Sequence, residues 1–256
     1  MKVTRRRFIN QFSLLTLPAL ALPWHITNKQ RIVNLDPAET SYTILFQGDS
    51  ITDGNRGRTD DPNHIMGHGY AFSIASRLGA DYPDRNLKFI NKGVSGNTVS
   101  DLASRWQEDT LRLKPDLVSV LVGVNDVFFE IKNNSHSSAE HFETALKELL
   151  TITNKQLPDT LFVLGEPFVL PVGMVKENLD KWTAAIQKRQ HIVKKLSKEF
   201  NAAFLGYQQV FQDACKKAPS DYWIWDGIHP TVPGHELMAR EWIRTVGEKL
   251  PLITSK

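Results

Sequence analysis

Cysteine is almost absent from this 256-residue chain, in which Cys215 is the only one. A single thiol cannot form an internal disulfide, and no CxxC pair is available for zinc or redox chemistry. The HExxH zinc motif is also missing, because Ala239 stands where a second histidine after His235 would be needed. The sequence therefore predicts a fold without disulfides and contains neither of these two metal-binding motifs.

An excess of basic charge is lacking as well, once the first 21 residues are set aside. The chain has 31 Lys and Arg against 28 Asp and Glu, but Met1–Ala21 contains four of the basic residues and no acidic one. The remainder is close to neutral and has no basic surface to displace counterions from phosphates. This excludes nucleic acid as an expected partner. The length and a hydrophobic share of 41% suit one globular domain.

No hydrophobic run is long enough for a typical membrane span. The apolar run Phe12–Leu22 is shorter than the ~20 residues that a bilayer requires. It follows Arg5–Phe8 and contains the small-residue cleavage candidate Ala19–Ala21, which is the layout of a signal peptide. The paired arginines resemble the bacterial twin-arginine export signal. An ordinary secretory signal and an uncleaved anchor are the alternatives.

These features predict an export signal over residues 1–21, a lead-in over 22–40 and a folded domain over 41–256. The expected location is periplasmic or extracellular, with no stable membrane association after signal cleavage. The sequence leaves the oligomeric state open, including a homo-oligomer.

From Tyr42 onward, short apolar runs alternate with longer segments of helical period. The strand candidates are rich in Val, Ile, Leu and Phe: Thr43–Gln47, Leu87–Asn91, Leu117–Gly123, Leu161–Gly165 and Ala203–Tyr207. The helix candidates are Tyr70–Leu78, Val99–Leu113, Ala139–Thr153, Lys176–Phe200, Gln208–Cys215 and Pro233–Leu250. The alternation predicts an α/β fold, a three-layer αβα sandwich around a parallel five-stranded sheet. In such sheets the functional site lies beyond the carboxyl ends of the strands.

The loop after the first strand candidate contains the sequence GDSITD, Gly48–Asp53. It presents the Ser50 hydroxyl at the predicted edge of the sheet, where a serine can act as a nucleophile. The alternative is that the serine or its neighbouring aspartate only caps a helix.

The loops after the second and third strand candidates are Gly93–Thr98 and Gly123–Asp126. They supply glycine backbone N–H groups and an asparagine amide at the same predicted edge. Acyl transfer needs such neutral donors where the carbonyl oxygen becomes negative. The alternative is that both sequences only make turns.

Near the C-terminus, Asp226 precedes His229 by three residues, and Pro230 follows. A carboxylate can hold the imidazole in the tautomer whose other nitrogen takes the serine proton. A surface turn with a neighbouring histidine is the alternative.

Taken together, the four loops resemble the four blocks of the GDSL or SGNH hydrolase family, in the same order. The resemblance covers roughly residues 43–246, with isoleucine where the family name has leucine. It implies a flavodoxin-like αβα fold and a serine esterase that needs no cofactor and no metal. It assigns Ser50, Asp226 and His229 to a catalytic triad, and the backbone of Ser50, the backbone of Gly96 and the side chain of Asn125 to an oxyanion hole.

Longer stretches, such as Asn91–Val99 and Trp225-Asp226, are similar to those of bacterial acetylxylan esterases. This similarity implies deacetylation of xylan or xylo-oligosaccharides, so the expected partner is an acetylated carbohydrate or another small ester. A broad-specificity or lipid-directed esterase of the same family is the alternative, because fold alone does not determine the substrate. A carbohydrate-binding module that has lost catalysis is a further alternative.

Two residues beside the triad are candidates for substrate binding. The Trp225 ring could stack on a sugar, and Asp49 adjoins Ser50, although Asp49 is also interpreted as a capping or supporting residue. Trp106 and Trp223 are expected to pack in the core. A glycosidase carboxylate pair is an alternative, drawn from Asp49, Asp53 and Asp126. This interpretation leaves His229 without a role. The loop after Ser50 contains four potential metal ligands, Asp60, Asp61, His64 and His68. A metal site there is a less favoured interpretation than a loop at the rim of the substrate site.

Overall fold

The computed structural model describes residues 41–132 and 137–250, all within one folded unit. The predicted export signal and lead-in, over residues 1–40, lie outside the described residues. Among the helices of the described ranges, none combines the length and the apolar character needed to cross a membrane.

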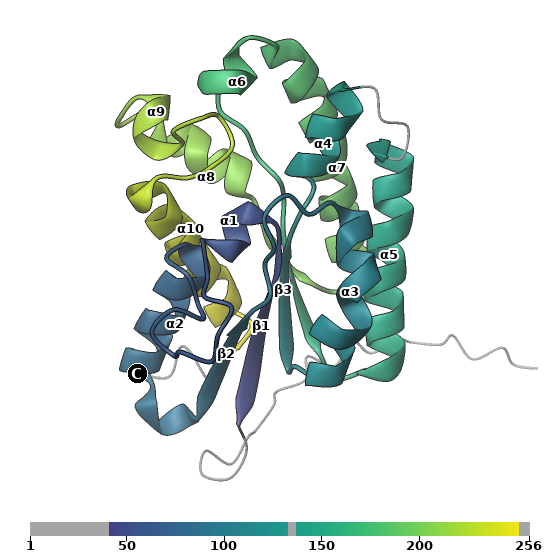
Figure 1. Ribbon diagram of the computed structural model, residues 1–256, viewed down its shortest axis with the longest axis vertical. Helices are drawn as coiled ribbons and strands as arrows, with labels where there is room; N and C mark the ends of the chain where they lie inside the picture. Colours follow the sequence, from purple (N-terminus) through teal and green to yellow (C-terminus); the bar gives the residue numbers. More distant parts are fainter. Residues whose placement is uncertain (1–40, 133–136, 251–256) are drawn as a thin grey trace, which may run out of the picture. The chain divides into compact units, whose positions relative to one another are not determined.

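Five parallel strands form the centre of the domain (Figure 1): β1 (Tyr42–Gly48), β2 (Leu87–Asn91), β3 (Leu117–Leu121), β4 (Leu161–Gly165) and β5 (Ala203–Leu205). Their order is β2-β1-β3-β4-β5, so β1 lies between β2 and β3. After β1 the chain forms β2 on one side of β1 and then β3 on its other side. This reversal of strand order creates a topological switch point beside the carboxyl end of β1. The loops that follow these three strands therefore emerge side by side. The predicted α/β class and the parallel five-stranded sheet are confirmed.

Helices cover both faces of this sheet. One face is covered by α2 (Tyr70–Asp81), α8 (Tyr207–Ala214) and α10 (Val232–Gly247), and the other by α3 (Val99–Asp109), α5 (Ala139–Gln156) and α7 (Leu179–Glu199). Four shorter helices follow strand ends or interrupt loops: α1 (Ser50–Asp53), α4 (Val124–Ile131), α6 (Gly173–Lys176) and α9 (Ser220–Trp223). In addition, 3₁₀ turns span Pro83–Arg85 and Leu111–Leu113.

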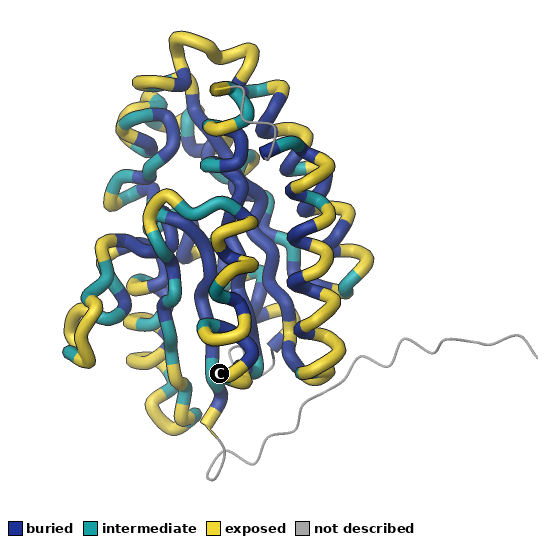
Figure 2. Tube along the Cα trace, turned by 45° about the vertical axis from the view of Figure 1, so that its right-hand side comes forward, coloured by how far each residue is buried: buried dark blue, intermediate teal, exposed yellow. Residues whose placement is uncertain are grey.

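The core consists of two buried clusters, one on each face of the sheet. Alternate residues of β1 point to opposite faces: Ile44 and Phe46 join the cluster that includes α2 and α10, and Leu45 joins the one that includes α3 and α5. Figure 2 shows the strands as the buried interior between helices whose outer sides are exposed. One buried hydrogen bond fixes α10 on the sheet, from Trp242 Nε1 to Ser119 Oγ over 3.0 Å.

Most predicted strands and helices begin within one residue of the position seen in the structure, whereas several end elsewhere, and the end of α3 has a tertiary cause. The helix predicted over Val99–Leu113 ends at Asp109. There the Gln47 side chain, reaching from β1, donates to the Asp109 carbonyl over 2.9 Å and to the Thr110 hydroxyl over 2.8 Å. These bonds occupy groups at the end of the helix, and Thr110 leaves the helical conformation.

Other segments also end elsewhere than predicted. The strand predicted over Ala203–Tyr207 ends at Leu205, and Tyr207 begins α8. Three further helices with shifted ends finish at Asp81 (α2), Gln156 (α5) and Gly247 (α10).

The helix predicted over Lys176–Phe200 is divided into α6 and α7, because Asn178 adopts a non-helical backbone with φ −132° and ψ 40°. The strand predicted over Leu117–Gly123 ends at Leu121, and the segment predicted as a loop forms α4, with Gly123 at its N-cap.

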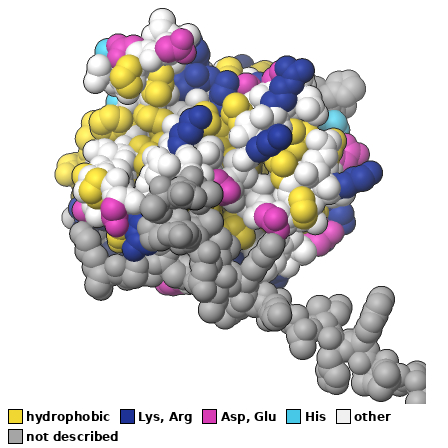
Figure 3. All heavy atoms as spheres, turned by 90° about the horizontal axis from the view of Figure 1, so that it is seen from below, with side chains coloured by type: hydrophobic (Ala, Val, Ile, Leu, Met, Phe, Trp, Pro, Cys, Tyr) yellow, Lys and Arg dark blue, Asp and Glu magenta, His cyan; other side chains and the backbone are white. Residues whose placement is uncertain are grey.

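Charges of both signs are mixed on the face opposite the carboxyl ends of the strands. Figure 3 views the molecule from that end, and basic and acidic side chains alternate over the part that grey atoms leave uncovered. This part of the surface has no concentration of positive charge of the kind that binds a phosphate backbone.

Candidate active site

Ser50 is the first residue of α1, directly after the carboxyl end of β1. The turn between them is tight: a Cβ atom at Gly48 would lie 2.2 Å from the Leu121 carbonyl oxygen of the neighbouring strand. Asp49 caps α1, because its carboxylate accepts a hydrogen bond from the Ile51 N–H over 3.0 Å. Glycine and the cap together present the serine hydroxyl at the sheet edge.

Ser50 and His229 lie in direct contact although they are 179 positions apart. Ser50 Oγ is 2.8 Å from His229 Nε2, and His229 Nδ1 is 2.6 Å from Asp226 Oδ2. The other Asp226 oxygen accepts the backbone N–H groups of Ile228 and His229, over 2.9 and 2.7 Å. The carboxylate is thus held in one orientation, in which it accepts a hydrogen bond from the Nδ1–H of His229. Nε2 is then left unprotonated toward the hydroxyl, as proton abstraction from a serine requires.

The pKa shifts of the two residues agree with this geometry. The hydrogen bond that the His229 ring donates to Asp226 raises the pKa of His229 above its ordinary value, against the opposing effect of partial burial. Burial alone would raise the pKa of Asp226, but hydrogen bonds from the His229 side chain and from two backbone N–H groups outweigh it and lower that pKa. The carboxylate therefore stays ionised and stabilises an imidazolium when one forms.

The segments that contain Gly96 and Asn125 meet at the same edge of the sheet. Gly96 lies in the loop after β2, with φ +83° and open space around its Cα. Asn125 lies in the first turn of α4, and its side-chain amide donates to the Asn97 carbonyl over 3.0 Å. This bond joins the two segments, and the second N–H of the same amide group is available to a further acceptor. Amide donors in these segments can stabilise an oxyanion formed at Ser50.

Arg105 is the most connected side chain of the site, and sequence reasoning gave it no role. Its guanidinium donates to the Asn97 side chain and the Lys92 carbonyl, both over 2.8 Å, and to the Gly48 carbonyl over 3.3 Å. It also donates to the side chains of Gln47 and Asp109. The planar donor fork of arginine thus ties the loop after β2 to the end of β1. Its position in a helix next to Trp106 gave no sign of this function.

Asp49 and Asp126 are buried, with 1% of each residue exposed. Burial raises the pKa of Asp49 to about 7 and that of Asp126 to about 6. The Asp126 carboxylate accepts the Val99 N–H, as the Asp49 carboxylate accepts that of Ile51. Both support backbone segments, and the burial of Asp49 argues against its predicted contact with substrate. The glycosidase pair is disfavoured for the same reason.

Trp225 is 63% exposed and lies beside His229. Its ring stacks on the imidazole of His229, with 6.2 Å between centroids and 24° between planes. Trp106, by contrast, is buried in the core, as predicted, and donates to Thr153. Trp223 packs against the other core cluster. Trp225 is therefore the tryptophan of this region whose face is open to a ligand.

The loop after α1 contains an Asp61–His64 pair, 2.7 Å apart. Across residues 41–132 and 137–250, no group of three or more His, Cys, Asp or Glu side chains is arranged to hold a metal ion.

Comparison with known proteins identifies the family. Residues 46–237 match the model of the GDSL-like lipase/acylhydrolase family. An acetylxylan esterase from Geobacillus stearothermophilus is 32% identical over 210 residues, which are 80% of this chain and 93% of the relative.

Solved structures give the same result. A putative GDSL-like lipase from Parabacteroides merdae is 38% identical with a TM-score of 0.78, covering 82% of this chain and 97% of its own. A catalytic mutant of Axe2, an acetylxylan esterase from G. stearothermophilus, is 31% identical with a TM-score of 0.74, covering 85% and 98%. Fold, site and relatives together define a carboxylic ester hydrolase. The chain belongs to the GDSL-like lipase/acylhydrolase family.

Proposed function

We propose that this esterase removes acetyl groups from carbohydrates, in particular from xylan or xylo-oligosaccharides, with Ser50 as nucleophile. The observation that carries the proposal is the continuous chain of hydrogen bonds from Ser50 through His229 to Asp226, over 2.8 and 2.6 Å. The similarity to an acetylxylan esterase supports the substrate class.

In the first half of the reaction, His229 Nε2 takes the Ser50 proton while Oγ attacks the acetyl carbonyl carbon. The carbonyl oxygen becomes negative and accepts hydrogen bonds from the backbone N–H groups of Ser50 and Gly96 and from the Asn125 amide. The tetrahedral intermediate then collapses, the C–O bond to the sugar breaks, and His229 gives its proton to the departing sugar hydroxyl. An acetyl-Ser50 enzyme remains.

In the second half, a water molecule attacks the acetyl carbon and His229 takes its proton. Collapse of this intermediate releases acetate and returns the proton to Ser50 Oγ. The ionised Asp226 stabilises the imidazolium in both halves. No step requires a metal or an organic cofactor.

Further support comes from variants of the related Axe2. Its catalytic mutants include alanine replacements of an aspartate, a serine and a histidine, and the aspartate and histidine are three positions apart, as Asp226 and His229 are. Another Axe2 mutant replaces the tryptophan directly before that aspartate. We infer that Trp225, directly before Asp226, contacts the sugar with its exposed face.

The experiment compares acetate release from acetylated xylo-oligosaccharides with hydrolysis of aryl esters of increasing acyl length, using Ser50→Ala as the blank. Preference for acetylated xylo-oligosaccharides supports the proposal. Preference for long-acyl esters would instead indicate a lipid-directed or broad-specificity esterase.

We also propose that residues 1–21 direct export of the folded protein. Fractionation of expressing bacteria tests this: the full-length chain is expected in the periplasm or medium, and replacement of Arg5, Arg6 and Arg7 by lysine is expected to retain it in the cytoplasm. Export of the lysine variant at the normal rate would contradict a twin-arginine route.

A further inference from the structure

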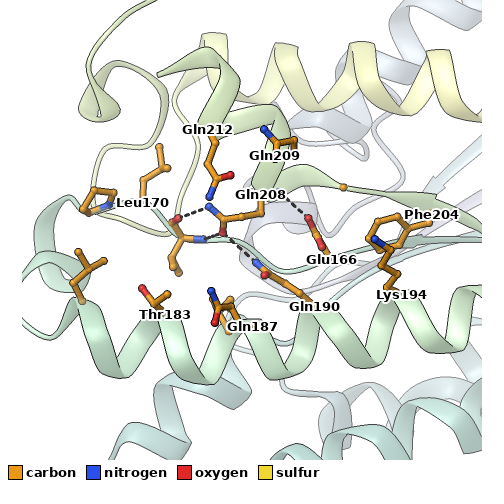
Figure 4. Close-up of a pocket in the computed structure, with 15 residues that line it drawn as sticks. Glu166, Leu170, Thr183, Gln187, Gln190, Lys194, Phe204, Gln208, Gln209 and Gln212 are labelled. Atoms are coloured by element: carbon orange, nitrogen blue, oxygen red, sulfur yellow. Dashed lines mark hydrogen bonds between the residues drawn. The ribbon is translucent and has the colours of Figure 1, made fainter. Parts of the chain in front are cut away.

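A cavity of about 640 Å³ lies between α7 and α8, and its lining includes none of the triad or oxyanion residues (Figure 4). Its walls come from these two helices, from the end of β5 and from the segment after β4. The volume lies within the range of ~300–1,000 Å³ that is usual for small-molecule sites. The proposed deacetylation uses no part of this cavity.

The lining is rich in neutral amides. Of its 15 residues, five are glutamines: Gln187, Gln190, Gln208, Gln209 and Gln212. The charged side chains are one carboxylate, Glu166, and one ammonium group, Lys194, so the cavity has no excess of either sign. Each amide offers both donors and acceptors, which is what the hydroxyl groups of a neutral ligand require. A strongly charged ligand would find no matching set of counter-charges.

Part of this polar lining is already fixed in place. The Gln208 amide donates to the Val169 carbonyl over 3.0 Å and accepts the Val169 N–H over 3.1 Å. Gln190 donates to Gln208 over 3.1 Å and to the Pro167 carbonyl over 2.9 Å. These two amides therefore form a preorganised base that loses little conformational entropy when a ligand binds.

Other amides are free to bind a ligand. Gln187 on α7 and Gln212 on α8 are exposed and make no side-chain hydrogen bond within the described residues. Figure 4 shows them on facing walls of the cavity. Apolar contact comes from Leu170 and Ile186 and from the half-buried ring of Phe204, over which the Lys194 ammonium group lies at 5.8 Å from the ring centroid. Amides above an apolar and aromatic surface suit a sugar ring, which has hydroxyl groups at its edge and C–H groups on its faces.

We propose that this cavity is a second, non-catalytic site that binds a neutral oligosaccharide. The sugar class follows from the cavity, whereas the choice of a xylose chain rests on the proposed function. The cavity wall is joined to the catalytic loop, because the Leu170 N–H donates to the Gly227 carbonyl over 3.0 Å. Gly227 lies between Asp226 and His229, so a sugar in the cavity binds beside the segment that supports the triad.

The test measures binding of xylotriose without acetyl groups to the wild-type chain by calorimetry, and maps the site by ¹⁵N chemical shifts. The Gln187→Ala/Gln212→Ala double variant is expected to bind at least about fivefold more weakly, because two free amides are lost. It is expected to hydrolyse acetyl esters at the wild-type rate. Gln107→Ala, an exposed helical glutamine on α3, is the matched control and is expected to bind as the wild type does. The charged trigalacturonate is expected to bind more weakly than xylotriose.

Three results would overturn the proposal: no binding at millimolar xylotriose, equal binding by the double variant, or shifts confined to the surroundings of Trp225 and His229. Failure of the proposed function is a separate outcome, since it would appear as absent acetate release from acetylated xylo-oligosaccharides while xylotriose still binds in the cavity.

Discussion

The Asp53 carboxylate accepts two hydrogen bonds from Ser95, one from the backbone N–H over 3.0 Å and one from the hydroxyl over 3.1 Å. Asp53 ends the short helix that begins with Ser50, and Ser95 immediately precedes Gly96. This pair therefore sets the distance between the proposed nucleophile and one of the proposed oxyanion donors. Arg58 holds the same carboxylate from the other side.

Asp53→Ala is expected to lower kcat by about 10- to 100-fold, because a small displacement of the Gly96 loop misaligns the reacting groups. KM for a small aryl acetate is expected to change less, since the pair does not contact the substrate. Steady-state kinetics test this, with Asp84→Ala, an exposed aspartate, as the control. Equal loss of activity in both variants, or an unchanged kcat in Asp53→Ala, would contradict a positioning role.

Ser50→Ala is expected to lower kcat for an aryl acetate by at least about 10³-fold without unfolding the chain. The protein offers a matched control in Ser100, whose hydroxyl also lies 2.8 Å from a histidine nitrogen, that of His141. That pair is exposed, and His141 has no hydrogen bond to a carboxylate within the described residues. Ser100→Ala is therefore expected to keep full activity, as measured beside the circular dichroism spectrum of each variant.

Asp226→Asn is expected to lower kcat by up to about 10⁴-fold, because an amide no longer holds the productive imidazole tautomer. The pH profile gives an independent signature. His229 must be neutral to accept the serine proton, and Asp226 raises its pKa, so wild-type kcat/KM rises with pH through a midpoint above the ordinary imidazole value. In the variant this midpoint is expected at lower pH. An unchanged midpoint would show that another group controls the acid limb.

Asn125→Ala is expected to lower kcat by about 10²–10³-fold with little change in KM, as for loss of one oxyanion donor. Asn154→Ala, an exposed asparagine on α5, is the control. A large rise in KM with normal kcat would instead assign Asn125 to ground-state binding.

Asp49→Asn is expected to raise the free energy of unfolding at high pH. Burial raises the folded-state pKa of Asp49 to about 7, above about 3.9 in an unfolded chain. The cost of the buried charge is therefore absent below the unfolded pKa, grows as pH rises between the two values and is constant above the folded pKa.

The asparagine amide can still cap α1 but cannot ionise, so the variant avoids a cost of at most about 4 kcal/mol above pH ~7, at about 1.4 kcal/mol per pKa unit. Thermal unfolding at pH 4, 6 and 8 measures the difference between the two proteins. A difference that does not widen with pH would contradict this assignment.

Sequence patterns predicted the strands and helices whose bounds depend only on neighbouring residues in the sequence. The bounds of β2 and β4 agree with prediction because a short apolar run between turns determines each. The end of α3 could not be predicted, because it depends on Gln47 from another strand. The helix α4 was missed because its first turn, Gly-Val-Asn-Asp, has the composition of a loop.

The candidate site likewise has residues that a local sequence pattern predicts and residues that it does not. Ser50, Asp226 and His229 could be predicted as neighbours from the residues of their loops and from the family resemblance, and the structure brings their side chains together. The burial of Asp49, the hydrogen bonds of Arg105 and the amide-lined cavity depend on side chains brought together from distant segments, and no local pattern indicates them.

Ser50 and His229, the proposed nucleophile and base, are separated by 179 positions, so the proposed mechanism requires both ends of the domain to be joined before an ester is cleaved. A ribosome-bound chain that has emerged only as far as β5 already contains the proposed nucleophile and both proposed oxyanion segments but not the proposed base. Hydrolytic activity should therefore switch on late in biosynthesis, when the last helix packs against the sheet. A protease cut within the Asp226–His229 turn would silence the enzyme while most of the sheet is still intact.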